Sequence, residues 1–420
     1  MTVQEYLTVA EALSMVLNGV APLPSTEVSL DDALGRILAG SIVAKDSLPP
    51  FANSSMDGYA VRSADVEGAG MDSPISLEVL ADIAAGTVAD VVVTHGTAAR
   101  IMTGAAMPQG ADAVVPVEDT NEPWRNSVRS LPEHILVSRA VKRGDYIRPI
   151  GEDIEAGQLV LSPGHILRPQ EIGVLAALGI SQAPVHRRPR VGLLSTGDEL
   201  IAVEQALEPG KIRDSNSYAQ AAQIKNLGAE PISLGVARDQ EEDVCRKLEL
   251  GLEQNVDLFV SSAGVSVGAY DVVKAVLEKE GNVGFWRVRM RPGKPLAFGT
   301  YHGVPYLGLP GNPVSAMVSF ERFVRPAILK LAGCKEFARP ELTVLFQEEI
   351  WSDGRETYVR AIVTRTAEGY EAISTGSQGS HVLTSLVKAN ALVIIPEGVK
   401  KVETGTPLRA MMIDWPASVF

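Results

Sequence analysis

Residues 191–198 read Val-Gly-Leu-Leu-Ser-Thr-Gly-Asp, a short apolar run that ends in a polar, glycine-containing turn. A helical pattern follows at about 216–227 and ends at Gly228. The alternation then continues, with strands predicted at 232–237, 256–261, 284–290, 296–300 and 304–309 and helices after 239 and at 271–280. A last helix is predicted from Asn312-Pro313, with a kink at Pro326. Repeated βα units predict an α/β domain over 188–332 with a doubly wound, mostly parallel sheet.

The sequence on either side of this domain lacks the alternation of strands and helices. From 46 to 145, short apolar runs alternate with Gly and Pro, which predicts a β module. A connector at 146–187 carries many glycines and a helix at about 169–178. After a linker at 333–340, five apolar runs predict a small five-stranded β-barrel within 333–420. Residues 1–45 are predicted to form a connector with a helix at 8–20, started by a Thr8–Glu11 capping box, and a short helix at 30–39.

Composition limits the classes of partner. The 420 residues carry 38 Lys and Arg against 51 Asp and Glu, a net charge of −13. Neutralising a nucleic-acid backbone requires a surplus of basic residues, so no nucleic-acid partner is expected. No apolar run approaches the ~20 residues of a membrane span, and no signal peptide is visible. Two cysteines in unrelated contexts cannot form a disulfide framework. We therefore expect a cytoplasmic protein without a membrane partner.

In a doubly wound sheet, ligands bind beyond the carboxyl ends of the strands. The loop after 191–195 places Asp198 and Glu199 there, and two adjacent carboxylates could hold Mg²⁺. A capped turn with solvated acids is the alternative. The next loop, 261–268, is rich in Gly and Ser and includes Ser266, which suits close approach to an anion but equally a plain tight turn. Asp271 follows it, either as a site residue or as a helix N-cap.

Two further loops have anion-binding character. Arg287, Arg289 and Arg291 alternate, so on one strand they would share a side, with Lys294 nearby. Guanidinium groups bind tetrahedral oxyanions through paired hydrogen bonds, and we favour an oxyanion site over a surface stripe. The loop at 308–315 delivers backbone amides and the hydroxyl of Ser315 to a helix start. No nucleophile–base pair is evident, so covalent catalysis is not indicated.

Several motifs together resemble one family, the molybdopterin molybdenumtransferases, which include the E domain of gephyrin. They run through nearly the whole chain and are specific only in combination: Pro49–Ala60 (PPFANSSMDGYA), Arg100–Ala105 (RIMTGA), Gly151–Ile154 (GEDI), Ser195–Leu200 (STGDEL), Gly264–Gly268, Arg291–Gly299, Gly308–Ala316 and Gly376–His381 (GSQGSH).

The resemblance implies an elongated homodimer of four-subdomain protomers, with active sites shared between an α/β domain and the partner's N-terminal β module. It implies Mg²⁺-dependent insertion of molybdate into adenylated molybdopterin, which releases AMP. An adenylyltransferase that supplies the adenylate is a candidate partner.

The same resemblance assigns roles to residues. Asp57, Thr103, Glu199, Asp239 and Asp271 match catalytic positions, and Asp198 joins Glu199 and Asp271 as a metal ligand. Substrate-binding positions are matched by Ser266, Arg287, Arg291, Lys294, Pro295, Ser315, Arg360 and Ser380. Asp239 is equally expected to cap a helix with Glu242, and Asp57 alone would pass for a turn residue. Arg360 and Ser380 would otherwise be a strand-surface Arg and a turn Ser, and Asp153 and Asp214 are weaker candidates.

The chain departs from the family pattern at four positions. Ala263 and Ala269 stand where Gly and an acid are usual, and Arg287 and Arg291 stand where Lys is common. These changes bear on metal affinity and on the preference between molybdate and tungstate. Two alternative functions stay open: a catalytically weak molybdopterin-binding scaffold, and the adenylyltransferase that makes the adenylate from ATP.

Overall fold

The computed structural model describes residues 6–122, 130–262 and 272–416. The chain divides into two compact units. The first contains residues 1–39, 164–168 and 183–420, and the second contains 40–163 and 169–182.

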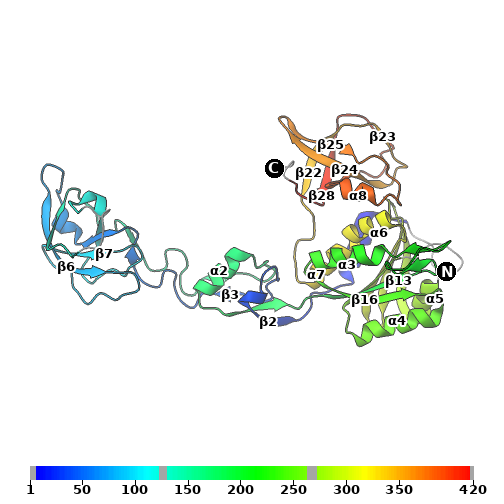
Figure 1. Ribbon diagram of the computed structural model, residues 1–420, viewed down its shortest axis with the longest axis horizontal. Coiled ribbons are helices and arrows are strands. Elements are labelled where there is room, and N and C mark those ends of the chain that lie inside the picture. Colours follow the sequence, from blue (N-terminus) through cyan, green and yellow to red (C-terminus); the bar gives the residue numbers. More distant parts are fainter. Residues whose placement is uncertain (1–5, 123–129, 263–271, 417–420) are drawn as a thin grey trace. The chain divides into compact units, whose positions relative to one another are not determined.

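The first unit is built on a seven-stranded sheet (Figure 1). In spatial order its strands are β1 (Tyr6–Leu7), β18 (Gly281–Val288), β20 (Pro295–Tyr301), β21 (Val304–Leu309), β17 (Leu258–Ser262), β13 (Arg190–Thr196) and β16 (Glu230–Ala237). Neighbours from β21 to β16 are parallel, whereas β20 runs antiparallel to both β21 and β18. The mostly parallel α/β sheet that the sequence predicts is confirmed.

Helices cover both faces of this sheet. They are α1 (Val9–Asn18), α3 (Asn216–Asn226), α4 (Glu241–Glu253), α5 (Val272–Glu280), α6 (Pro313–Ser319) and α7 (Arg325–Leu331). Successive strand residues point to opposite faces. Accordingly, Leu193 of β13 packs in one core with Ile224 of α3, and Leu194 packs in another with Leu248 of α4. Helices on both faces make the sheet doubly wound, with α3 and α4 on opposite sides of it in Figure 1.

The C-terminal part of the first unit is a closed five-stranded barrel. Its strands follow the order β24 (Glu356–Thr366), β25 (Gly369–Ser374), β22 (Glu341–Phe346), β28 (Thr406–Met412) and β26 (Ala391–Ile395), and β26 pairs back onto β24. The predicted barrel is therefore confirmed. A sixth short strand, β19 (Met290–Arg291), comes from the α/β domain and pairs with the start of β24.

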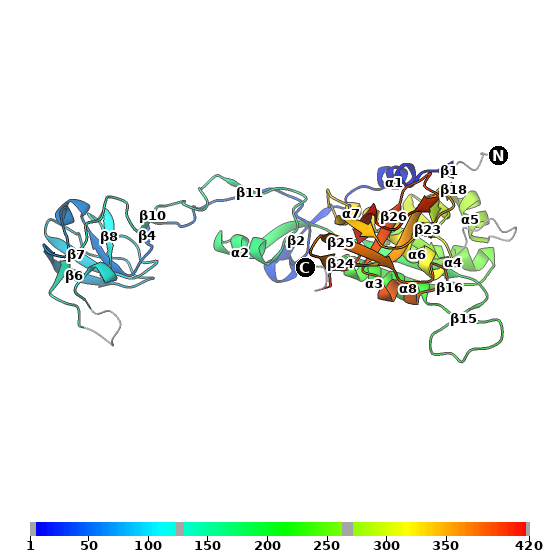
Figure 2. The same cartoon turned by 90° about the horizontal axis from the view of Figure 1, so that it is seen from above.

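Smaller elements complete the first unit. They are β2 (Ser25–Ser29) with β12 (Gln182–His186), β14 (Leu200–Ile201) with β15 (Ile212–Arg213), β23 (Ile350–Trp351) with β27 (Lys401–Val402), a 3₁₀ turn at Leu30–Asp32 and α8 (Thr384–Lys388). The chain between β14 and β15 stands out from the domain as a loop (Figure 2).

The second unit contains the β module. Its five-stranded sheet has the order β8 (Ala113–Pro116), β5 (Gly58–Val61), β7 (Thr97–Ile101), β6 (Ile75–Ile83) and β9 (His134–Val137). Neighbouring residues of β5 are buried in two different hydrophobic clusters: Tyr59 packs with Val115 in one, and Ala60 packs with Val114 in the other. The unit also holds β3 (Ile42–Val43) with β11 (Leu159–Leu161), β4 (Asn53–Ser54) with β10 (Ile147–Arg148), α2 (Pro169–Ala177) and 3₁₀ turns at Ser63–Val66 and Val117–Asp119.

Two predictions about helices are wrong. The helix expected at 30–39 is only the three-residue 3₁₀ turn, because Gly35 takes a positive φ of 72° and Leu38 bridges to Val185 instead. Asp239 does not cap α4, which begins at Glu241 after Gln240. The acid that binds the backbone there is Asp243, whose Oδ2 accepts from the amide of Arg238 at 2.9 Å.

Two other local predictions hold. Thr8 and Glu11 form the capping box that starts α1. The last helix is interrupted ahead of Pro326 by a π-helical turn at Phe320–Val324, as expected for a ring that displaces the preceding backbone. Among the described residues, none of the helices combines the length and apolar character that crossing a membrane requires.

Candidate active site

A cleft of about 500 Å³ lies in the first unit, between the loops of the α/β sheet and a loop of the barrel. Its walls come from three segments: Arg291–Pro295, Pro310–Asn312 with Ser315, and Gln378–Ser380 with Arg355. The first two segments precede β20 and follow β21. The third belongs to the barrel, and the amide of Val314 donates to the carbonyl of Ser380 at 3.1 Å. Residues far apart in the sequence thus share one polar cavity.

The basic segment reaches the cleft because the chain changes sheets there. β18 ends at Val288, whose amide donates to the carbonyl of Lys294, and Met290–Arg291 then pairs with β24. The prediction that Arg287, Arg289 and Arg291 share one side of a continuous strand is therefore wrong. Arg289 leaves the group altogether, since its Nε lies 3.1 Å from Oε1 of Glu397.

The remaining cations fall into two neighbouring groups. Arg291 and Lys294 line the cleft. Arg287 lies beyond it, where its Nη1 donates to the hydroxyl of Tyr6 at 3.1 Å. The guanidinium of Arg287 and the ammonium of Lys294 both lie within 6 Å of the Tyr6 ring centre. The hydrogen bond from Arg287, together with the positive charges of Arg287 and Lys294, lowers the pKa of the Tyr6 hydroxyl.

Arg360 is the most unusual cation of this region, because it is only 1% exposed. Its Nε donates to Oγ of Ser385 at 3.1 Å and its Nη2 to the carbonyl of Gly379 at 3.2 Å. In the described part of the chain, no carboxylate forms an ion pair with it. Burial, and then the charge of Arg291, lower the pKa of Arg360 to about 10. A buried cation without a counter-charge favours an anion nearby.

Three cleft residues with polar side chains were not among the site residues predicted from the sequence: Asn312, Arg355 and Gln378. Gln378 lies inside the Gly376–His381 motif. Its side-chain amide makes two hydrogen bonds with the backbone of Arg360, accepting from the amide and donating to the carbonyl. Asn312 belongs to the anion-binding loop predicted at 308–315, but the sequence gives its own side chain only the role of a helix cap, and in the structure it makes no capping hydrogen bond. Arg355 follows an Asp-Gly pair that resembles an ordinary turn, so nothing in its local pattern marked it.

The acidic candidates are partly placed. Asp198 and Glu199 are exposed after β13, and Nζ of Lys211 donates to the carbonyl of Asp198 at 2.7 Å. The amide of Asp239 lies 3.4 Å from Oδ1 of Asp198, which brings these two acids together. Ser266 and Asp271 lie outside the described residues. Within the described ranges, no group of three or more His, Cys, Asp or Glu residues is arranged as a metal site.

Asp214, a weaker candidate, has a structural explanation. It is buried at the strand ends, where its carboxylate accepts from Oγ of Ser195 at 2.7 Å and from the amide of Ser217 at 3.1 Å. For Asp153, only a backbone contact is given: its amide donates to the carbonyl of Leu48 at 3.0 Å, within the second unit.

The other two catalytic candidates, Asp57 and Thr103, lie in the second unit. Both the amide and the hydroxyl of Thr103 donate to Oδ1 of Asp57, at 2.6 and 2.8 Å. The sequence separates these residues by 46 positions, so their contact is a product of the β-module fold.

Three family models match the chain in succession: the MoeA N-terminal region (domain I and II) over residues 7–179, a probable molybdopterin binding domain over 192–330, and the MoeA C-terminal region (domain IV) over 343–411.

Named relatives match over nearly the whole length. A molybdopterin molybdenumtransferase from Nostoc sp. is 39% identical over 417 residues, covering 97% of this chain and 94% of that protein. Molybdopterin molybdenumtransferase 2 from Mycobacterium tuberculosis is 40% identical over 389 residues, covering 91% and 93%. The crystal structure of a molybdopterin biosynthesis MoeA protein from Pyrococcus horikoshii aligns with a TM-score of 0.82 at 31% identity, covering 97% of this chain and 100% of that one.

Proposed function

The chain belongs to the molybdopterin molybdenumtransferase family and is a transferase, and we propose that it inserts molybdate into adenylated molybdopterin with release of AMP. The observation that carries the proposal is the cleft, which gathers Arg291, Lys294 and Arg355 with two hydroxyl-bearing residues, Ser315 and Ser380, in a chain of net charge −13. Forked guanidinium donors and hydroxyls suit a tetrahedral oxyanion such as molybdate.

Each group has a physical task. Arg291 and Lys294 would bind the dianionic molybdate and offset its repulsion from the phosphorylated pterin, which also carries negative charge. The hydroxyls of Ser315 and Ser380 would orient oxygens of the oxyanion. When molybdate and the adenylate are held in one cavity, their reaction becomes effectively unimolecular. Positioning alone therefore accelerates it, because the entropy cost of bringing the two together has been met on binding. No protein nucleophile is required, because water would attack the pterin phosphate of the adenylate and the bond to AMP would break, so that AMP leaves.

Two exposed carboxylates after β13 support the proposal that the reaction uses Mg²⁺. Mg²⁺ is usually held by one or two carboxylates together with substrate phosphates and water, and Asp198 and Glu199 offer two exposed carboxylates. We propose these two as ligands, with Asp271 as a third. When bound, the ion would act as a Lewis acid on a phosphoryl oxygen of the adenylate.

We also propose that the chain works as a homodimer in which Asp57 and Thr103 of one protomer complete the site of the other. The resemblance supports this arrangement, and the Asp57–Thr103 contact supports it by making the pair one preformed unit. Sedimentation of the purified chain tests the stoichiometry. A monomer at micromolar concentration that still turns over substrate would overturn the shared site.

The function is tested by incubating the purified chain with adenylated molybdopterin, molybdate and Mg²⁺ and measuring AMP by chromatography. We expect AMP release that depends on molybdate and falls at least about 100-fold in Arg291→Gln. Arg365→Gln is the matched control, because Arg365 is an exposed residue at the other end of β24 and does not line the cleft. It should keep full activity.

Two outcomes would replace the proposal. Consumption of ATP with metal-free molybdopterin, without AMP release from the adenylate, would identify an adenylyltransferase. Tight binding of the adenylate with no turnover of either substrate would identify a scaffold.

A further inference from the structure

Arg355 joins the barrel to the loop that presents Arg291. Its Nη1 donates to the backbone carbonyl of Met290 at 3.0 Å, across 65 residues of sequence. The amide of the next residue, Glu356, donates to the carbonyl of Arg289 at 3.1 Å. Arg355, just before β24, and Glu356, its first residue, therefore bind the backbone on both sides of Met290, immediately before Arg291 enters the cleft.

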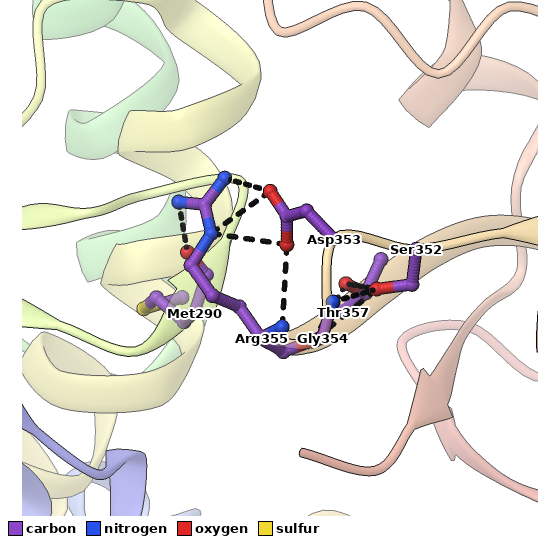
Figure 3. Close-up of polar contacts among 6 residues, drawn as sticks. All are labelled: Met290, Ser352, Asp353, Gly354, Arg355 and Thr357. Atoms are coloured by element: carbon purple, nitrogen blue, oxygen red, sulfur yellow. Dashed lines mark hydrogen bonds and ion pairs between the residues drawn. The ribbon is translucent and has the colours of Figure 1, made fainter. Parts of the chain in front are cut away.

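Asp353 fixes the guanidinium of Arg355 (Figure 3). Nε of Arg355 lies 3.1 and 3.0 Å from the two carboxylate oxygens of Asp353, and Nη2 donates to one of them. Oδ1 of Asp353 also accepts from the amide of Arg355 at 3.2 Å. Figure 3 shows the guanidinium lying between the Asp353 carboxylate and the Met290 carbonyl. Asp353 thus orients the Arg355 side chain, and in that orientation the guanidinium binds the carbonyl of Met290.

The contacts of Arg355 differ from those of an ordinary surface ion pair. Ion pairs between exposed residues contribute little to stability, and Asp353 is only two residues from Arg355. The bond to Met290 is of another kind, because it links two domains and its acceptor is the carbonyl of a fully buried residue. Moreover, Arg355 and Arg291 line the same cleft.

We propose that Arg355 is a positioning residue for the oxyanion site. Held by Asp353, its guanidinium fixes the Met290 carbonyl and thereby sets the place of Arg291 in the cleft. This inference rests on the proposed function, since it takes the cleft to be the molybdate site. It predicts that Arg355 acts on the oxyanion through Arg291 and not by its charge alone.

The experiment measures molybdate and tungstate binding by calorimetry, which requires no turnover. Arg355→Gln should weaken oxyanion binding about tenfold, the loss expected when one charge-assisted contact is disturbed. Arg355→Lys should not restore binding, because an ammonium cannot hold Asp353 and the Met290 carbonyl in the same planar geometry. In AMP release, the molybdate concentration for half-maximal rate should rise with little change in the maximal rate.

A double-mutant cycle separates positioning from a purely structural role. In an Arg291→Gln background, replacing Arg355 by Gln should have no further effect on binding, because its target is already gone. Full additivity, or full rescue by Lys, would overturn the inference. If the wild-type chain binds molybdate but Arg355→Gln matches the Arg365→Gln control, the inference fails and the proposed function stands. If the wild-type chain binds no oxyanion, both fail.

Discussion

Thr103 donates both its amide and its hydroxyl to a single carboxylate oxygen of Asp57, at 2.6 and 2.8 Å. One acceptor with two donors from the same residue fixes the turn after β7 against the turn before β5. The carboxylate therefore has a structural task, and its negative charge is a separate property that a substitution can remove alone.

Asp57→Asn removes the charge and keeps the oxygen that accepts from Thr103. If the charge takes part in the reaction, AMP release should fall about 100-fold while the free energy of unfolding changes by less than about 0.5 kcal/mol. Activity assays and urea unfolding check the two parts. Asp90→Asn, an exposed acid in the same module, is the control. Equal rates in both variants would leave Asp57 with only its structural task.

Gly293 limits what the cleft loop can accommodate. Its φ is +105°, and a Cβ atom there would lie 2.4 Å from Oγ of Ser319, which is fully buried. Gly303 has a comparable φ of +83° with open space around it. Gly293→Ala should therefore cost about 1–3 kcal/mol more stability than Gly303→Ala, because overpacking is added to backbone strain. Urea unfolding of the two variants measures the difference. Equal losses in the free energy of unfolding would show that the loop at Gly293 shifts to accommodate the added methyl group without cost.

Arg360→Lys tests the buried cation of the barrel. Lysine keeps the charge but cannot reach Ser385 and Gly379 with one planar fork. We expect a loss of about 1–3 kcal/mol in stability and a rise of about tenfold in the molybdate concentration for half-maximal AMP release. An unchanged molybdate dependence would argue against an oxyanion contact in the barrel.

The ion pair of Asp353 should persist well into the acid range. Hydrogen bonding from Arg355 lowers the pKa of Asp353 below its ordinary 3.8. A carboxyl group with a depressed folded-state pKa stabilises the protein above its unfolded-state pKa, and that contribution is lost only as the pH falls below 3.8 toward the folded-state value. The stability difference between wild type and Asp353→Asn should therefore be constant from pH 8 to pH 5 in urea titrations. A difference that vanishes by pH 5 would contradict the lowered pKa.

Much of the fold could be predicted from local patterns. The alternation of apolar runs and helical periods gave the α/β sheet, and the spacing of apolar runs after 340 gave the barrel, because hydrophobic periodicity reports which faces of an element are buried. Errors arose where the backbone path depends on more than apolar periodicity, as at the positive φ of Gly35 and at the change of sheet after Val288. At the start of α4 the acceptor is Asp243 and not Asp239, and only the folded backbone decides between two such acids.

Some features of the cleft could likewise be predicted from local patterns, and others could not. The sequence by itself indicated that Arg291, Lys294 and Ser315 lie close to the ends of the sheet strands, because the positions of strands and of a helix start follow from local sequence patterns. Only the tertiary structure decided that Arg289 turns to Glu397, that Arg360 is buried, and that Arg355 reaches Met290. Those outcomes depend on β19 leaving the α/β sheet to pair with β24, a contact between distant segments whose energy no local pattern contains.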